Sequence, residues 1–274
     1  MNNKGSLLII TVWVLVFFSI LNIALYHIVS SQIKIAKRLR EITNSTYLAK
    51  AAYAYARYQI IYDDTAHDSL YELQTEEERE LSGGAFSYKM IDEESKININ
   101  IASKVILSRV PGFNEELAER IAGSSLRPFK LKQELFAVEG ITDDVFTQAA
   151  EFITVYGKGR VNINTAGEEV LVALGMDTSL INIINDFRAG NDGVVLTEDD
   201  MFFEGSSTIL KQLSGFTGLF QQQQAVLIQL SSKNLLGVSG ENFRLQVDTK
   251  ISGKSGKAYE IVMDEEKILL WREN

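Results

Sequence analysis

The feature that most constrains this chain is a long uncharged segment close to its N-terminus. Between Ser6 and Ile33 the sequence has no Asp, Glu, Lys or Arg, whereas about 20 apolar residues suffice for a helix to cross a bilayer. A cleaved secretory signal usually has an apolar core of about 7 to 15 residues followed by a small-residue cleavage site. This run is longer and no such site follows it, so it predicts a membrane-spanning helix.

The same helix is expected to continue beyond the membrane. No Gly or Pro occurs between Gly5 and Gly83, and apolar residues recur every three or four positions from Ile35 to Tyr62. We expect one helix from about Ser6 to Tyr62, about 85 Å long, with its first half in lipid and its second half an amphipathic stalk.

The charges that flank the apolar run do not settle its orientation. Lys4 precedes the run, and four basic residues follow it. The positive-inside rule would place the side with more Lys and Arg in the cytoplasm. The basic residues after the run are Lys34, Lys37, Arg38 and Arg40.

Composition excludes several kinds of chemistry. There are no cysteines, which excludes disulfides, Cys-based zinc sites and thiol nucleophiles. The two histidines are His27, inside the apolar run, and His67, and neither stands near a sequence typical of a hydrolase nucleophile. We therefore expect no enzymatic activity. The net charge of −9 also argues against general affinity for nucleic acid.

Beyond the helix the sequence predicts a linker and then a strand. Residues 63–84 are rich in acidic side chains and end in a Gly pair, which is typical of a solvated linker. Phe86, Tyr88 and Met90 then alternate with polar residues, as in a strand with one buried face. Residues 92–95 are expected to form a turn.

Two later stretches resemble each other. INIASKVILSRVPGFNEELAERI begins at Ile99, and INTAGEEVLVALGMDTSLINII begins at Ile163. Each predicts a short helix, a tight turn at Gly112 or Gly175, and a second helix. A third such turn is expected at Gly140. Glycine permits the sharp turn of a helix-hairpin-helix motif.

Helix-hairpin-helix motifs often bind DNA, which makes DNA binding an alternative function of this region. In DNA-binding hairpins a second glycine, two positions after the first, lets backbone N–H groups approach a phosphate. Asn114, Thr142 and Asp177 occupy these positions here. Acidic residues also outnumber basic ones across the helical region. We therefore expect a structural helical module.

The C-terminal region predicts an antiparallel meander. In FRLQVDTKI, Phe243, Leu245, Val247 and Ile251 lie on one face, and AYEIVM and ILLW follow as two further strands. Strands before and after the helical region predict an α+β fold in which one sheet is interrupted by an inserted all-α domain.

One acidic segment could bind a metal. NDGVVLTEDDMFFEG crowds five carboxylates together, and Ca²⁺ takes 6 to 8 oxygen ligands. The spacing does not follow the EF-hand pattern, so a solvated loop is favoured and Ca²⁺ binding is the alternative. The candidate ligands are Asp192, Glu198, Asp199, Asp200 and Glu204; no other cofactor is expected.

The N-terminus resembles the type IV prepilin class. In that class a short leader ending in Lys-Gly precedes the apolar helix and is removed by a prepilin peptidase, which implies a cut between Gly5 and Ser6. Most members carry Glu at the fifth mature position, which here is Ile10. Because that carboxylate is thought to pair with a neighbouring subunit, its absence implies a subunit at one end of a filament.

The whole chain resembles the K-type minor pseudopilins of type II secretion, the general secretion pathway protein K family. The resemblance rests on the leader, the missing acid at Ile10, DEESKININIAS, GRVNINTAGEEVLVAL and the closing VMDEEKILLWRE. It implies a pilin-like sheet with an inserted helical domain, divided into leader 1–5, membrane and stalk helix 6–62, linker and first strands 63–98, helical insert 99–236 and final strands 237–274.

The resemblance also implies a function. We expect a non-enzymatic tip subunit that helps initiate the pseudopilus, bound to other minor pseudopilins, anchored in the bacterial inner membrane and carrying a periplasmic domain. A membrane-tethered DNA receptor of a competence system is the alternative. A minor type IV pilin is less well matched, because it would not ordinarily carry the helical insert.

Overall fold

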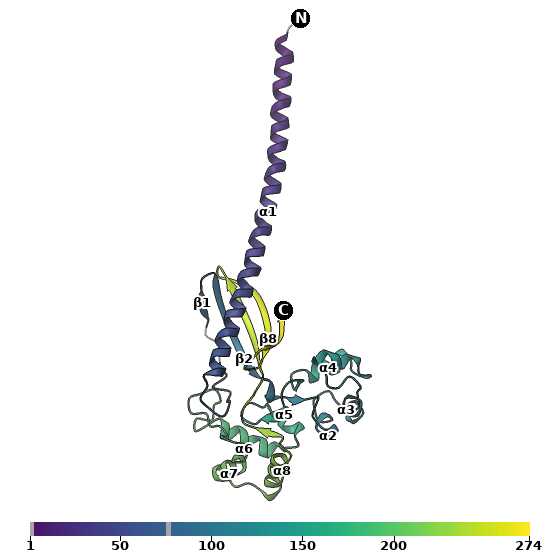
Figure 1. Cartoon of the computed structure of the whole chain (residues 1–274), viewed down its shortest axis with the longest axis vertical. Coiled ribbons are helices and arrows are strands. Elements are labelled where there is room, and N and C mark those ends of the chain that lie inside the picture. Colours follow the sequence, from purple (N-terminus) through teal and green to yellow (C-terminus); the bar gives the residue numbers. More distant parts are fainter. Residues whose placement is uncertain (1–2, 75–77) are drawn as a thin grey trace.

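The structure, a computed structural model, describes residues 3–74 and 78–274 (Figure 1). Helix α1 (Asn3–Ile61) is a single helix that extends far beyond the rest of the molecule. This confirms the expected long helix and its end near Tyr62. No Gly or Pro lies within it after Gly5, so no residue breaks its hydrogen-bond ladder.

The second half of α1 packs on an antiparallel sheet. The sheet has the order β1-β2-β7-β8-β9, with every neighbouring pair antiparallel. Its strands are β1 (Arg79–Leu81), β2 (Gly84–Asp92), β7 (Phe243–Ile251), β8 (Lys254–Met263) and β9 (Ile268–Glu273). Because β2 pairs directly with β7, the chain leaves the sheet after β2 and returns beside it, which confirms the interrupted sheet.

The core between α1 and the sheet follows the alternation seen in the sequence. Small residues of α1 allow close approach, and the inward residues of the strands lie against them. Asp92 and Phe243 are paired in register, so both ends of the insert leave the sheet at one point. The core includes Leu48, Ala49, Ala52, Ala56, Phe86, Tyr88, Met90, Leu245, Val247, Tyr259 and Ile261.

The insert consists of two lobes with the same plan. Lobe 1, residues 97–154, contains β3 (Ile97–Asn98), α2 (Lys104–Leu107), α3 (Glu115–Ala122), the 3-10 helix η2 (Lys132–Ala137), α4 (Asp143–Ala149) and β4 (Ile153–Thr154). Lobe 2, residues 161–237, contains β5 (Val161–Asn162), α5 (Glu168–Ala173), α6 (Thr178–Arg188), α7 (Ile209–Phe216), α8 (Gln221–Ser232) and β6 (Leu236–Gly237). In each lobe the first and last strands form a two-residue parallel pair.

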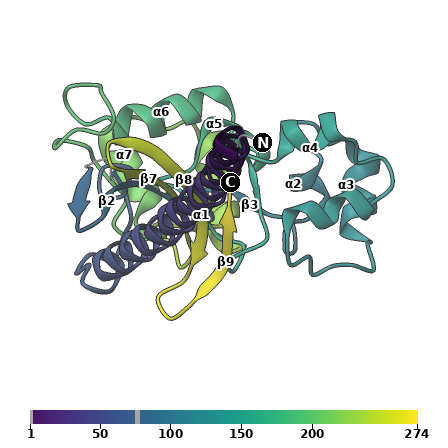
Figure 2. The ribbon, with the colours of Figure 1, turned by 90° about the horizontal axis from the view of Figure 1, so that it is seen from above.

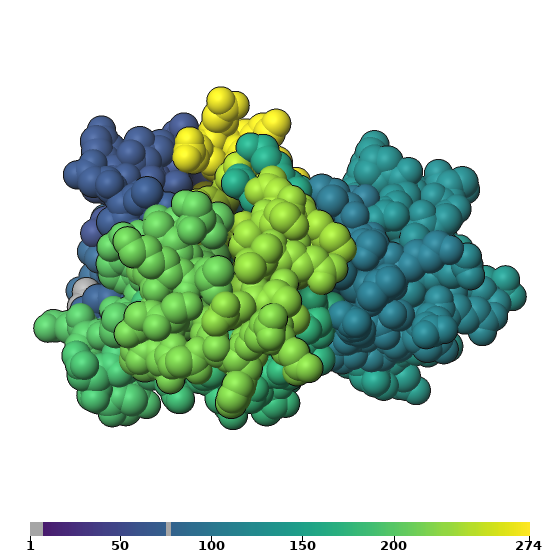
Figure 3. All heavy atoms as spheres, turned by 90° about the horizontal axis from the view of Figure 1, so that it is seen from below, coloured from purple at the N-terminus to yellow at the C-terminus, as the bar shows by residue number. Residues whose placement is uncertain are grey.

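The two lobes share one hydrophobic core but sit differently on the sheet. A single cluster of buried residues runs from Ile97 to Val238. Viewed along α1, lobe 1 projects to one side, whereas the helices of lobe 2 lie beyond the end of the sheet (Figures 1 and 2). From the opposite end, the lobes cover most of the visible surface (Figure 3).

The structure corrects three details of the sequence interpretation. The linker is not simply solvated, because Asp68, Ser69 and Leu73 are buried. Strand β1 was not predicted; it forms a hairpin with β2. The expected turn after β2 is the 3-10 helix η1 (Glu93–Ser95), and Glu93 and Glu94 in it are buried.

Candidate functional site

The first half of α1 is an uncovered apolar surface. Over residues 8–29 nearly every side chain is exposed. Leu8–Ile61 includes a window of mean hydropathy 2.6, none of it buried, which is long and apolar enough to cross a membrane. The large exposed residues include Leu8, Ile9, Ile10, Trp13, Phe17, Ile20, Ile23 and Ile28.

The predicted processing bond and the unusual apolar position both lie on this helix. Gly5 and Ser6 fall within the first residues of α1, and Met1 and Asn2 of the predicted leader lie outside the described residues. Ile10 is 57% exposed. The cut at Gly5 and the assembly role of Ile10 stay predictions.

The three expected hairpins are present in the helical module. Gly112, Gly140 and Gly175 have φ angles of +81°, +93° and +97°, in the region that glycine enters without strain. They join α2 to α3, η2 to α4, and α5 to α6. The repeat seen in the sequence is therefore a repeat of structure, with a 3-10 helix in place of the first helix of the middle hairpin.

The residues that replace the second glycine are helix caps. Asn114 Oδ1 accepts the Leu117 N–H at 2.8 Å, Thr142 Oγ1 accepts the Val145 N–H at 3.3 Å, and Asp177 Oδ1 accepts the Leu180 N–H at 2.8 Å. Each cap uses an N–H group that a phosphate would need. The side chains of the hairpins thus already occupy one N–H group at the start of each following helix.

One asparagine in each lobe is hydrogen-bonded to a distant segment of the same lobe. In lobe 1, Asn100 accepts the Phe129 N–H at 2.7 Å and donates to the Phe129 carbonyl at 2.8 Å. In lobe 2, Asn164 makes the same two bonds to Phe203, at 2.8 and 3.1 Å. The two Asn-rich stretches noticed in the sequence are therefore equivalent clamps on distant backbone.

The acidic segment between α6 and α7 is ordered by its own carboxylates. Asp199 Oδ2 accepts the N–H groups of Asn191 and Asp192 at 2.8 and 3.0 Å, and Asp200 accepts those of Leu196 and Thr197 at 2.8 and 3.3 Å. The hydrogen bond from the Thr197 hydroxyl, followed by those from the backbone N–H groups, holds the pKa of Asp199 below its usual value.

The same segment bears on the Ca²⁺ alternative. In residues 3–74 and 78–274, no group of three or more His, Asp or Glu side chains is arranged to hold a metal ion. Ca²⁺ binding by Asp192, Glu198, Asp199, Asp200 and Glu204 stays a prediction, which calorimetry of the full chain with Ca²⁺ and with EDTA would test.

The densest polar site lies where the insert joins the sheet. There Asp92, the last residue of β2, accepts hydrogen bonds from Asn162 Nδ2 and Thr165 Oγ1, both at 2.7 Å. Asp92 Oδ1 also accepts the Glu94 N–H at 2.7 Å. Glu94 in turn accepts the Asn242 N–H at 3.1 Å and its side-chain amide at 2.8 Å. These bonds join β2, lobe 2 and the start of β7.

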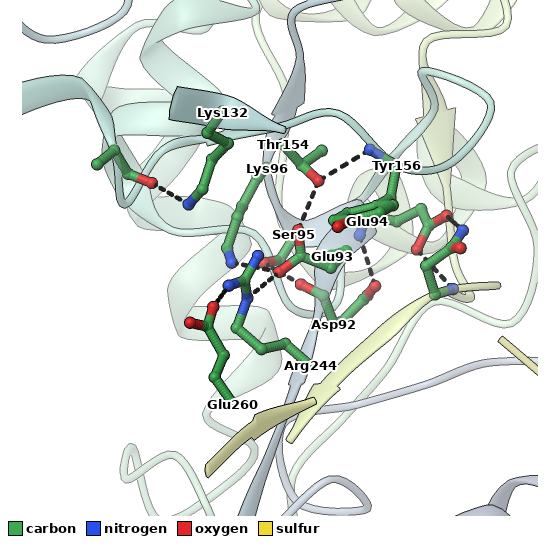
Figure 4. Close-up of polar contacts among 12 residues, drawn as sticks. Asp92, Glu93, Glu94, Ser95, Lys96, Lys132, Thr154, Tyr156, Arg244 and Glu260 are labelled. Carbon is green, nitrogen blue, oxygen red and sulfur yellow. Dashed lines mark hydrogen bonds and ion pairs between the residues drawn. The ribbon is translucent and has the colours of Figure 1, made fainter. Parts of the chain in front are cut away.

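Next to it, Glu93 is the centre of an ion-pair network (Figure 4). Its Oε1 lies 2.8 Å from Lys96 Nζ and 2.6 Å from Arg244 Nε, and its Oε2 accepts the Thr154 hydroxyl at 2.5 Å. Arg244 also pairs with Glu260 of β8. Lobe 1 is thereby tied to the sheet. We call residues 92–96 with Thr154, Asn162, Thr165, Asn242 and Arg244 the junction.

Burial and charge move the junction carboxyls in opposite directions. Burial raises the pKa of Asp92 to about 6 and that of Glu94 to about 7. Burial also opposes the ionisation of Glu93, but Lys96 and Arg244 outweigh it and lower its pKa to about 2. The junction thus combines one firmly ionised carboxylate with two that titrate near neutrality.

Sequence reasoning missed the junction. The sequence predicts a turn at residues 92–95, but it does not indicate that Glu93 and Glu94 are buried there. The one available signal was the run Asp92, Glu93, Glu94 directly after a buried strand and next to Asn98. The partner of Glu93, Arg244, lies 151 positions further along the chain, so no local pattern joins the two residues.

Comparison with known proteins supports the motif and the fold. Residues 92–154 match the family model described as "Helix-hairpin-helix motif", and no curated protein matches the sequence. A solved chain in the GspK-GspI-GspJ complex of the type 2 secretion system from enterotoxigenic Escherichia coli is similar in structure, with 14% identity and a TM-score of 0.62. The similarity covers 87% of this chain and 99% of that one, so the two share a fold: a long helix, an antiparallel sheet and an inserted helical module.

Proposed function

We propose that this chain is a minor pseudopilin of a type II secretion system, that it occupies the tip of the pseudopilus, and that it helps initiate assembly for protein export across the outer membrane. One observation carries the proposal. The helical module lies at the end of the sheet opposite the exposed half of α1 (Figure 1). A subunit of this shape can join others along its helix while its far end is closed by the module.

The exposed half of α1 is the expected assembly surface. In pilin-like filaments, subunits associate through such helices, and packing in lipid favours close helix contacts. Ile10 supplies no carboxylate for pairing with a neighbouring subunit. This fits a subunit that does not have to dock beneath another one.

The partners and location follow from the same proposal. The solved complex contains GspK with GspI and GspJ, and we infer that this chain likewise binds two other minor pseudopilins. A prepilin peptidase would first cut between Gly5 and Ser6. The mature chain would remain anchored in the inner membrane, with residues beyond the apolar run in the periplasm, and would have no enzymatic activity.

The processing step gives the first test. Replacing Gly5 with Trp should leave an uncut chain with the leader attached, which intact-mass analysis of the membrane extract would show. Secretion by a strain carrying this variant should fall to the level of a strain lacking the gene, whereas Ile9→Val should be processed and active. Wild-type secretion by the uncut variant would contradict the proposal.

The position in the filament gives the second test. Because the chain has no cysteine, a single cysteine at Ile10 or Ile23 can report neighbours by crosslinking. We expect crosslinks to the other minor pseudopilins and none to the major one. A chain in which a short turn replaces residues 94–241 should still crosslink but should no longer end the filament.

A DNA receptor remains the second candidate, because residues 92–154 match a helix-hairpin-helix model. The caps at Asn114, Thr142 and Asp177 speak against phosphate binding by the hairpins. A salt-dependent shift of duplex DNA by the purified full chain would favour this candidate over the pseudopilin.

A further inference from the structure

A cleft separates lobe 1 from the sheet face that is turned away from α1. It has a volume of about 750 Å³. Lys89, Arg244 and Glu260 of the sheet line one side, and Lys132 and Ala150 of lobe 1 line the other. A recess of about 160 Å³ continues between Lys132 and Arg272 of β9. Figure 4 shows Lys132 and Arg244 approaching the cleft from the two sides.

Five cations line the cleft and its recess: Lys89, Lys96, Lys132, Arg244 and Arg272. Three of the five form ion pairs: Lys96 and Arg244 with Glu93, and Arg244 and Arg272 with Glu260. These two carboxylates are shared among the three cations. The other carboxylates that line the cleft, Glu151 and Asp248, form no ion pair within the described part of the chain.

Two of these cations, Lys89 and Lys132, have no carboxylate partner among the described residues, and of the two only Lys132 is partly buried. Its Nζ donates to the Ala150 carbonyl at 2.6 Å, and no Asp or Glu of the described residues lies within ion-pair distance of it. Burial, together with the smaller effects of Arg244 and Lys96, lowers its pKa to about 8 against an opposing effect of Glu93. A half-buried cation among other cations is costly unless an anion pairs with it.

The recess also has an apolar side. Leu131, Phe146, Val155 and Leu270 line it together with the cations. A free anion would leave these side chains against water, whereas the methylene groups of an acidic side chain would cover them. The combination fits a carboxylate at the end of a short aliphatic stem.

We propose that this cleft is a binding site for an acidic side chain of a partner protein, with its carboxylate paired to Lys132 and facing Arg272. The site lies between the insert and the sheet, so the partner would contact both parts at once. The inference does not depend on the proposed secretion function, because it rests on the unpaired lysine and the lining of the recess.

The test uses the full chain in detergent and a ten-residue Ala/Glu peptide as the probe. We expect the peptide to bind by calorimetry and to protect Lys132 from amine acylation, read by mass spectrometry. K132Q should weaken binding about tenfold, because one charge-assisted hydrogen bond is lost. K132R should restore it, and K104Q, at an exposed lysine outside the cleft, should leave it unchanged. Circular dichroism checks that each variant is folded.

Two controls identify the source of the carboxylate. The same peptide with Gln for Glu should not bind, and acetate should bind far more weakly than the acidic peptide. Binding of the acidic peptide should also weaken as the pH rises through about 8, where Lys132 loses its proton. Acetate as tight as the peptide would overturn the protein partner. Absence of binding, or equal binding by K132Q, would overturn the site itself.

Discussion

The two lobes of the insert show how one structural plan can serve two attachments. Asn98 in lobe 1 and Asn162 in lobe 2 occupy equivalent positions. Asn98 Nδ2 donates to the Tyr156 and Gly157 carbonyls, at 2.6 and 2.9 Å, close to its own lobe. Asn162 Nδ2 donates instead to the Asp92 carboxylate at 2.7 Å and to the Asp68 carbonyl at 3.2 Å.

The difference shows that the two lobes are fixed to the sheet by different contacts. In lobe 2, Asn162 is hydrogen-bonded to the sheet and to the linker. In lobe 1, Asn98 is hydrogen-bonded to residues that follow the lobe, and the lobe contacts the sheet through Thr154 and Glu93. The repeated motif therefore predicts the local fold of both lobes. The residues outside the motif determine how each lobe is attached to the sheet. The predictions below test this contrast in order of decreasing effect.

Replacing Asn98 or Asn162 with Ala should give the largest difference in stability between variants of the two lobes. Asn162→Ala leaves the buried Asp92 carboxylate short of a donor and should cost about 4 kcal/mol of unfolding free energy. Asn98→Ala loses bonds to neutral carbonyls and should cost about 2 kcal/mol. Urea unfolding followed by circular dichroism measures both. Equal losses would contradict the assigned difference.

The hairpin glycines should also respond unequally. A Cβ at Gly112 would lie 2.9 Å from the Val145 carbonyl oxygen and 2.9 Å from Gln148 Cβ, whereas at Gly175 it would meet the Arg109 guanidinium at 2.6 Å. Backbone cannot move as readily as the end of an arginine.

We therefore expect Gly112→Ala to cost about 3 kcal/mol and Gly175→Ala about 1 kcal/mol, because both force alanine to a positive φ but only one clashes with backbone. Hydrogen exchange read by mass spectrometry would place the first loss in lobe 1. A larger effect at Gly175 would show that the Arg109 contact is rigid.

The pH dependence should distinguish the junction from lobe 1. The folded-state pKa values of Asp92 and Glu94, about 6 and about 7, lie above their ordinary values of 3.8 and 4.5. The folded state therefore holds more protons between pH 4 and 7, and stability falls as the pH rises through this window. We therefore expect the free energy of unfolding to decrease from pH 4 to pH 7 as these two carboxyls lose their protons.

Glu93 acts in the opposite sense at lower pH. Its pKa of about 2 lies below the ordinary 4.5, so its contribution is lost as the pH falls through that range. Hydrogen exchange, corrected for intrinsic rates, should show faster opening of residues 161–164 at pH 7.5 than at pH 5, with little change in α3. A flat profile at the junction would contradict the assignment.

The smallest expected effect concerns the helix caps. Asn114→Ala and Asp177→Ala each remove one cap and should cost about 1 kcal/mol. Asn114→Gly, which restores the second glycine of a DNA-binding hairpin, should still give no DNA shift at physiological salt, because the field around lobe 1 is not basic. A shift in this variant alone would show that the cap is what prevents phosphate binding.

Local patterns were sufficient to predict much of the fold. The absence of Gly and Pro predicted α1, alternation predicted β2 and β7, and Gly112, Gly140 and Gly175 predicted the three turns. The insert was predicted because strand patterns lie on both sides of the helical stretch. These features depend on neighbours within a few residues.

The junction and the cleft depend on residues far apart in the sequence. Glu93 looks exposed until Arg244 and Thr154 are placed beside it, and Lys132 looks like any surface lysine until the sheet lies against it. Asp68 was read as part of a solvated linker, yet it accepts the Gly240 N–H at 2.7 Å across 172 positions. Such contacts leave no periodic pattern.

The pairing of Asp92 with Phe243 has a mechanical consequence. Because the insert enters and leaves at neighbouring points of one strand pair, a push on the lobes reaches the sheet through β2 and β7, which lie against α1, and reaches the linker through the bond of Asn162 to Asp68. The insert is attached where Asp92 pairs with Phe243, and the ion pair of Glu93 with Arg244 would resist its rotation about this point. A load applied to the lobes would thus pass through the two strands that pack directly on the long helix.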